Sequence, residues 1–233
     1  MNLADKVIAK YLKKTGTKLD AGKNPLDVKA AFWILKHFIP LRRETDGKVL
    51  PENGEKILDR ILETTNGAFT DDGCIGSQRE LAYVPFAKEG NTADHGCGWI
   101  SVYNALKLLG TEEEPEMLLR EMAYGARKKG KGGVNPFYVY RWLKRKGFRT
   151  NIVTGMERMD REGKKVPVFI LCYLYLSDSG KVGGHFAAGC WEDGFRIYNG
   201  EKPGRVTYER IEDAFSSGTV FKMMITIEKT EDC

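Results

Sequence analysis

Three residues of the 233-residue sequence have types and positions that suit nucleophilic catalysis: Cys97, His185 and Asn199. Cys97 begins a long apolar segment, CGWISVYNALKLL, which predicts a buried helix. A helix N-terminus offers partial positive charge and free N–H groups, which favour a thiolate and can hold an oxyanion. We therefore predict that Cys97 is a nucleophile with a lowered pKa, and that the flanking Gly96 and Gly98 leave room for a substrate backbone.

A thiolate nucleophile needs a base, and His185 is the histidine best placed to act as one. It begins a predicted strand that a Glu-Asp-Gly turn joins to the next predicted strand. A hairpin brings its two ends side by side, so Asn199 is expected beside His185, where it can fix the tautomer and orientation of the imidazole. His37 lies within an apolar segment, and His95 belongs to a loop that would anchor it poorly.

Helices come first in this chain and strands follow, which predicts an α+β fold and not alternating βα units. The apolar periodicity predicts an N-terminal helical extension, residues 1–75, and a catalytic domain, residues 76–233. Helices are expected over 3–14, 26–39, 55–64 and 97–109, from a cap at Thr111 to about 124, and over 136–147 and 211–215. Strands are expected over 81–86, 148–153, 166–175, 185–191, 195–198, 205–208 and 219–227. A loop or linker is expected over 66–77, a loop over 88–96, and a Thr111–Glu114 capping box before the fifth helix.

Composition and hydropathy limit the classes of protein to consider. Hydrophobic residues make up 42% of the chain and the net charge is +5, which excludes disorder of the whole chain. No long apolar core follows the basic N-terminal residues, and the longest apolar-rich run, 166–176, is too short to span a bilayer. We therefore expect a cytoplasmic protein without a membrane partner.

Cysteine spacing and basic clusters point to no further site. The five cysteines include no Cys-x-x-Cys pair, so neither a disulfide framework nor a zinc site is expected. The cysteines expected to be ordinary apolar side chains are Cys74, Cys172, Cys190 and Cys233. Two basic clusters, over 127–131 and 141–149, are interpreted as solvated faces, so a nucleic-acid partner is not expected.

The order cysteine, histidine, asparagine resembles the papain-like cysteine peptidases, and more closely the bacterial double-glycine (bacteriocin-processing) peptidase group. In that group a Val-Pro strand leads to a glutamine and then to an Asp-Cys-Gly that opens a helix. Here the segment YVPFAKEGNTADHGCG places Asn91 and Cys97 in the same order. A second block is also similar, with GGHFAAG around His185, then a hairpin, then Asn199.

This resemblance, which covers about residues 81–227, implies a papain-like fold in which a buried helix carrying the cysteine packs on an antiparallel sheet. It implies a thiol peptidase that acts on a peptide or protein through an acyl-enzyme and needs no cofactor or metal. The Cys97 N–H and the Asn91 amide would form the oxyanion hole. The sequence departs from the group's pattern at Asn91, which replaces the longer glutamine; Gln78 is another amide, at a different spacing.

Other functions remain open at this point. The same triad serves acyl transfer to an amine, so an acyltransferase or transglutaminase-like enzyme is the nearest alternative. A non-catalytic papain-like binding module would keep the pocket, and a nucleic-acid-binding protein would lose affinity steeply with added salt. The feature that separates these classes is the mutual geometry of Cys97, His185 and Asn199.

Overall fold

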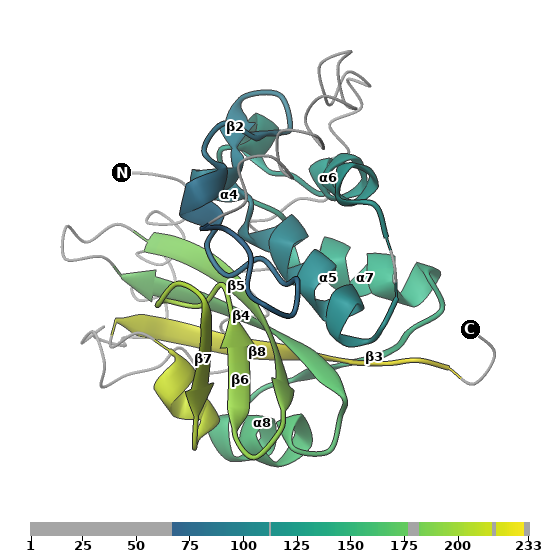
Figure 1. Cartoon of the computed structure of the whole chain (residues 1–233), viewed down its shortest axis with the longest axis vertical. Coiled ribbons are helices and arrows are strands. Elements are labelled where there is room, and N and C mark those ends of the chain that lie inside the picture. The colour runs from purple at the N-terminus through teal and green to yellow at the C-terminus, as the bar shows by residue number, and fades with distance from the viewer. Residues whose placement is uncertain (1–66, 112, 177–181, 216–217, 231–233) are drawn as a thin grey trace, which may run out of the picture.

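The structure is a computed structural model that describes residues 67–111, 113–176, 182–215 and 218–230. Within them, a six-stranded antiparallel sheet carries helices on both faces (Figure 1). The helices predicted over 3–14, 26–39 and 55–64 lie outside the described residues, so the predicted extension stays a prediction. The α+β fold class is confirmed.

The sheet has the strand order β3-β8-β4-β5-β6-β7. Its strands are β3 (Arg149–Val153), β4 (Val168–Leu176), β5 (Val182–Trp191), β6 (Phe195–Tyr198), β7 (Arg205–Tyr208) and β8 (Thr219–Glu228). The turn between β5 and β6 contains Asp193 and Gly194, both at positive φ, as a tight hairpin requires. The predicted hairpin that carries the candidate histidine and asparagine is therefore confirmed.

Helices and short elements make up the rest of the described chain. The α-helices are α4 (Thr92–His95), α5 (Cys97–Leu108), α6 (Pro115–Ala123), α7 (Pro136–Arg145) and α8 (Met156–Gly163). The 3₁₀ helices are η1 (Gln78–Leu81), η2 (Lys128–Gly130) and η3 (Ile211–Ala214). A small second sheet pairs β1 (Pro85–Phe86) with β2 (Gly90–Asn91). None of the described helices combines the length and the apolar character that crossing a membrane requires.

The central strands are covered on both faces, so the core has two layers. On one face, Trp99 of α5 packs in a cluster with Ile170 of β4 and with residues of α6 and α7. On the other face, Phe169 of β4 packs with Met159 of α8 and Ile211 of η3. Burial on both faces explains why β4 reads as a nearly continuous apolar run instead of an alternating pattern.

The segment over 67–77, which the sequence indicated as a loop or linker, is packed against this core from residue 67 onward. Cys74 and Ile75 are fully buried. The buried side chain of Asn104 on α5 accepts a hydrogen bond from the Ile75 N–H (2.7 Å) and donates one to the Ile75 carbonyl (2.8 Å). Asn104 therefore satisfies both main-chain groups of a residue that would otherwise be buried without partners.

Local predictions before α5 were wrong in detail. The expected strand over 81–86 is the end of η1 followed by only Pro85 and Phe86 in extended pairing, since proline cannot donate to a longer ladder. The expected loop over 88–96 contains β2 and the short helix α4. The side chain of Asn91 caps α4, which allows these polar residues to form a helical turn.

Two further helix predictions also differ from the structure. The Thr111–Glu114 capping box does not form, because α6 begins at Pro115 and no side chain caps its first turn. Helix α8 was not predicted at all, since its sequence, MERMDREG, is mostly polar and buries only Met159 and Gly163. In contrast, Asn135 caps α7 through the Phe137 N–H, as its Asn-Pro start predicted.

Candidate active site

Cys97 occupies the first turn of α5 because one glycine ends α4 and begins α5. The Gly96 N–H donates to the Thr92 carbonyl (2.9 Å), and the Gly96 carbonyl accepts from the Ile100 N–H (3.1 Å). Helix α5 then packs on the sheet, where it contacts β5 and β4. Cys97 is 5% exposed, so little of it is open to solvent in this state.

The two glycines beside Cys97 are needed for packing and do not leave open space. A methyl group on Gly98 would lie 2.7 Å from the side chain of Val134, and one on Gly96 would lie 2.6 Å from that of Thr92. Both distances are too short for a real contact. The expectation that these glycines make room for a substrate backbone was therefore wrong; they let neighbouring segments approach the start of α5.

The Cys97 sulfur lies against β5 at the residue that follows His185. It accepts a hydrogen bond from the Phe186 main-chain N–H, and the N–H groups of Gly98 and Cys97 also face it. The Phe186 N–H belongs to the peptide unit that joins it to His185. Cys97 and His185 therefore border the same peptide unit of β5, although they are 88 positions apart in the sequence.

Burial sets the protonation of both groups. Burial raises the pKa of the Cys97 thiol to about 11, and the hydrogen bonds from main-chain N–H groups only partly oppose this effect. Burial also lowers the pKa of His185, against the opposing effect of its hydrogen bond to the Asn199 carbonyl. The lowered thiol pKa that the helix terminus predicted is thus wrong for this state, because desolvation outweighs the helix terminus. Near neutral pH both side chains are uncharged.

The His185 ring is held from two sides. Its Nε2 atom lies 2.6 Å from the main-chain carbonyl oxygen of Asn199. A carbonyl can only accept, so the neutral ring carries its hydrogen on Nε2 and leaves Nδ1 as the basic atom. The ring of Tyr173, paired with His185 across β4 and β5, packs edge-on against it with centroids 5.5 Å apart.

Asn199 lies beside His185, where the hairpin was expected to place it, but its main chain makes the contact. Asn199 is 3% exposed and has a φ of +54°. Its Oδ1 atom accepts from the Gln78 main-chain N–H (2.9 Å), and its Nδ2 atom donates to Gln78 Oε1 (3.1 Å). The Asn199 amide is therefore bonded to Gln78 and not to the imidazole.

Gln78 is a partner of Asn199 that the sequence did not reveal. It is the first residue of η1, and its Nε2 atom donates to the Ala93 carbonyl of α4 (2.7 Å). Its spacing from Cys97 does not match that of the glutamine in the double-glycine peptidase group. No local pattern predicts a partner that lies 121 positions away.

Asn91, the predicted second donor to the oxyanion, is engaged with Asp94 in this state. Its Oδ1 atom accepts from the Asp94 N–H (2.8 Å), and its Nδ2 atom donates to Asp94 Oδ2 (2.8 Å). An amide nitrogen carries two hydrogens, so one hydrogen of Nδ2 is not used by this contact.

The other residues considered from the sequence fall outside this site or support the core. Cys74, Cys172 and Cys190 are buried free thiols, while Cys233 lies outside the described residues. Trp99 is fully buried, and its Nε1–H donates to Thr92 Oγ1 (3.2 Å). Among the described residues, no group of three or more His, Cys, Asp or Glu side chains is arranged to hold a metal ion.

The basic clusters are partly neutralised by nearby carboxylates. Lys129 and Lys131 lie 2.8 and 3.3 Å from the two carboxylate oxygens of Glu89. In the second cluster, Lys146 lies 3.3 Å from Glu113 and 3.5 Å from Glu121. Such exposed pairs are typical of a solvated surface and contribute little to stability.

Two solved structures are similar to this chain. The first is the peptidase domain of Streptococcus ComA, a bi-functional ABC transporter involved in a quorum sensing pathway. It has a TM-score of 0.41 and 18% identity, and the match covers 63% of this chain and 97% of that one. The second is a double-glycine motif protease from an AMS/PCAT transporter in complex with its leader peptide. It has a TM-score of 0.40 and 14% identity, with 64% of this chain and 94% of that one covered.

The first is a peptidase domain, and the second is a double-glycine motif protease. No protein-family model matches the chain, and no curated protein matches its sequence significantly.

Proposed function

We propose that this protein is a cysteine peptidase that cleaves a peptide through a thioester intermediate. The observation that carries the proposal is the position of the Cys97 sulfur on the Phe186 N–H, beside a histidine whose Nε2 is held by the Asn199 carbonyl. Cys97 and His185 border one peptide unit of β5, and a nucleophile near a base that a third group orients is the arrangement that acyl transfer needs.

In the proposed reaction, His185 Nδ1 takes the proton of the Cys97 thiol, and the sulfur attacks the carbonyl carbon of the scissile amide. The Cys97 N–H and the unused hydrogen of Asn91 Nδ2 would hold the oxyanion. The His185 imidazolium then gives its proton to the leaving nitrogen. In the second half, His185 takes a proton from water, hydroxide attacks the thioester, and the proton returns to the Cys97 sulfur as the acid leaves.

This reaction starts from an uncharged pair, since burial raises the pKa of Cys97 and lowers that of His185. An uncharged pair is the form that a buried site favours at rest. The main-chain N–H groups that face the sulfur are then available to stabilise the thiolate as the proton leaves.

We further propose a peptide or protein as substrate, a catalytic domain spanning residues 76–233 and a cytoplasmic location. The peptide substrate is supported by the nature of one similar structure, a protease in complex with a leader peptide. The chemistry assigned here needs no metal or organic cofactor.

The test is digestion of a proteome-derived peptide library by the full chain, read by mass spectrometry. Wild type is expected to produce fragments that share a cleavage sequence, and Cys97→Ala is expected to produce none of them. His185→Ala should lower the cleavage rate by about 10²–10⁴-fold, the range for loss of a general base. The matched control is Cys190→Ala, which removes a different buried thiol, located on β5, and should cleave as wild type does. Equal fragment sets from wild type and Cys97→Ala would contradict the proposal.

A further inference from the structure

We propose that Gln78 is a positioning residue of this site. Gln78 binds the side-chain amide of Asn199, so that the main-chain carbonyl of Asn199, and not its amide, orients His185. This inference rests on the proposed function, because it assigns Gln78 a part in preparing His185 as the base. It adds a residue that the Cys-His-Asn arrangement does not contain.

The first support is that Gln78 occupies both ends of the Asn199 amide. Its main-chain N–H donates to Asn199 Oδ1 (2.9 Å), and its Oε1 accepts from Asn199 Nδ2 (3.1 Å). With the amide fixed in this way, the Asn199 carbonyl is the group that meets His185 Nε2, at 2.6 Å.

The second support is that Gln78 also contacts the cysteine side of the site. Its Nε2 atom donates to the carbonyl of Ala93 in α4, the helix that directly precedes the Cys97 turn. Hydrogen bonds therefore run without interruption from Ala93 through Gln78 and Asn199 to His185. Gln78 is the one residue in this series that contacts both the cysteine-bearing segment and the turn after β6.

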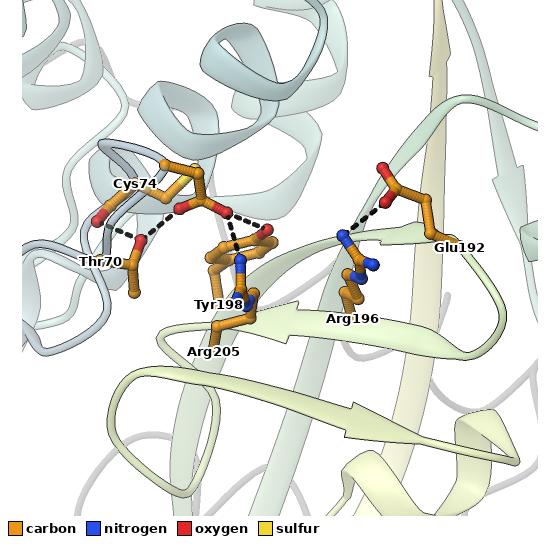
Figure 2. A network of polar contacts seen from close by, with 7 residues as sticks. Thr70, Cys74, Glu192, Arg196, Tyr198 and Arg205 are labelled. Atoms are coloured by element: carbon orange, nitrogen blue, oxygen red, sulfur yellow. Dashed lines mark hydrogen bonds and ion pairs between the residues drawn. The ribbon is translucent and has the colours of Figure 1, made fainter.

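The third support is that the segment leading to Gln78 is itself anchored to the same turn. We call this set of contacts the polar clasp, comprising residues 67–78 and 198–205. The Tyr198 hydroxyl donates to Asp72 Oδ2 (2.6 Å), and the Arg205 guanidinium contacts the same oxygen (3.1 Å). Figure 2 shows Tyr198 and Arg205 pointing together toward the loop that carries Thr70 and Cys74.

Glycines close the clasp beside Gln78. The Gly204 N–H donates to the Gly76 carbonyl (2.8 Å), and a methyl group on Gly76 would lie 2.7 Å from the Gly204 Cα atom. The two main chains therefore lie in direct contact. This contact fixes the start of η1, and with it Gln78, relative to the turn that follows Asn199.

A physical reason makes the carbonyl the better orienting group. A side-chain amide has an acceptor, Oδ1, and a donor, Nδ2. A free Asn199 amide could therefore rotate either to accept a hydrogen bond from the imidazole or to donate one to it. A main-chain carbonyl only accepts, which restricts neutral His185 to the Nε2–H tautomer with Nδ1 as the base. By binding the amide, Gln78 removes the alternative that would place the hydrogen on Nδ1.

The experiment reads the tautomer of His185 by nitrogen NMR of the full chain, above the ordinary histidine pKa of about 6.5. Its signals are assigned by their loss in His185→Gln. Wild type is expected to show only the Nε2–H form. In Gln78→Met, which keeps the side-chain length but makes no side-chain hydrogen bond, the Nδ1–H form is expected to appear. Arg79→Ala changes an exposed neighbour of Gln78 and is the matched control, expected to keep the wild-type tautomer.

A kinetic measurement on a peptide that wild type cleaves gives the second readout. Gln78→Met should lower kcat by about 10–100-fold, as expected for a misplaced catalytic group, with little change in KM. If Gln78→Met impaired only folding, the fraction of active protein would fall, and the folded fraction would keep the wild-type tautomer of His185.

Should Gln78→Met fail to fold, Asn199→Gly decides. Glycine accepts the positive φ and keeps the carbonyl but has no amide that could turn toward the imidazole, so the Nε2–H form should persist in this variant. An Nδ1–H form in the folded variant would show that the Asn199 carbonyl does not set the tautomer, and it overturns the inference. If wild type cleaves no peptide, the proposed function fails, whereas the tautomer measurement still tests whether Gln78 positions His185.

Discussion

Two regions hold the candidate site, and they are built by different forces. The helix that carries Cys97 is positioned by apolar packing, with Trp99 and Ile100 fully buried against the sheet. The polar clasp positions Asn199, and through it His185, by hydrogen bonds and an ion pair. Apolar packing has no preferred direction, whereas hydrogen bonds depend on angle as well as distance.

This difference matches what the proposed reaction requires of Cys97 and His185. A nucleophile has to be present at one place and shielded from solvent, and burial achieves both while raising the pKa of the Cys97 thiol. A base has to present one chosen nitrogen, which requires directional contacts such as the one between His185 Nε2 and the Asn199 carbonyl. Variants in the first region should therefore mainly change stability, and variants in the second should mainly change alignment.

The largest effect is expected in the apolar region. Trp99→Ala removes a fully buried indole and the hydrogen bond from its Nε1–H to Thr92, so we expect a loss of about 3–5 kcal/mol in the free energy of unfolding. Urea unfolding followed by circular dichroism measures this loss. The matched control is Tyr124→Ala, since this aromatic side chain is 48% exposed and should cost far less. Equal losses in the two variants would contradict the packing described for α5.

The second effect concerns the thiol that this packing buries. A pKa of about 11 for Cys97 predicts that alkylation by iodoacetamide is slow near neutral pH and increases with pH well beyond the range of an ordinary thiol. Relative to an ordinary thiol pKa of about 8.5, the thiolate fraction near neutral pH is lower by more than 100-fold. Mass mapping of the labelled site over a pH series gives the profile, and the same chain in urea is the reference. A plateau of fast labelling near neutral pH would show instead a resting thiolate.

The smallest effect on stability is expected in the polar clasp. Burial raises the pKa of Asp72, but hydrogen bonds from Thr70, Tyr198 and Arg205 together outweigh it, so the pKa is lowered overall. Because these contacts are near the surface, Asp72→Asn should cost less than about 1 kcal/mol.

The pH dependence of this cost has a definite sign. With its pKa lowered by folding, Asp72 binds fewer protons in the folded state, so its contribution is complete above the unfolded pKa of about 3.9. The contribution is lost as the pH falls through the folded pKa. The free energies of unfolding of wild type and Asp72→Asn should therefore converge as the pH is lowered. A difference between them that grows on acidification would contradict the lowered pKa of Asp72.

The same contrast explains how much could be predicted from the sequence. The bounds of β6 and β7 were predicted as observed, since a clear turn signal precedes β6 and polar and apolar residues alternate along β7. Helix α5 was predicted because its apolar run ends at Gly110, and the structure gives this glycine the positive φ typical of a helix end. The position of Asn199 beside His185 followed from hairpin pairing alone.

Other features had no signal in the sequence. Helix α8 is mostly polar, and Met159 is the one side chain larger than glycine that it buries fully against the sheet. The exchange of hydrogen bonds between Gln78 and Asn199 depends on the full three-dimensional arrangement, since neither residue has an unusual neighbourhood in the chain. The raised pKa of Cys97 likewise depends on how deeply α5 is buried, which periodicity does not measure.

The distance along the chain between the two halves of the polar clasp has a consequence for the order of folding. Gln78 and Asn199 are 121 positions apart, and Asp72 and Arg205 are 133 apart. Closing such long loops costs chain entropy before any stabilising contact forms, so these contacts are expected to form after the local helices and hairpins. A chain still emerging from the ribosome would therefore carry its cysteine before its histidine is aligned, and the site would become competent only when nearly all of the sheet is complete.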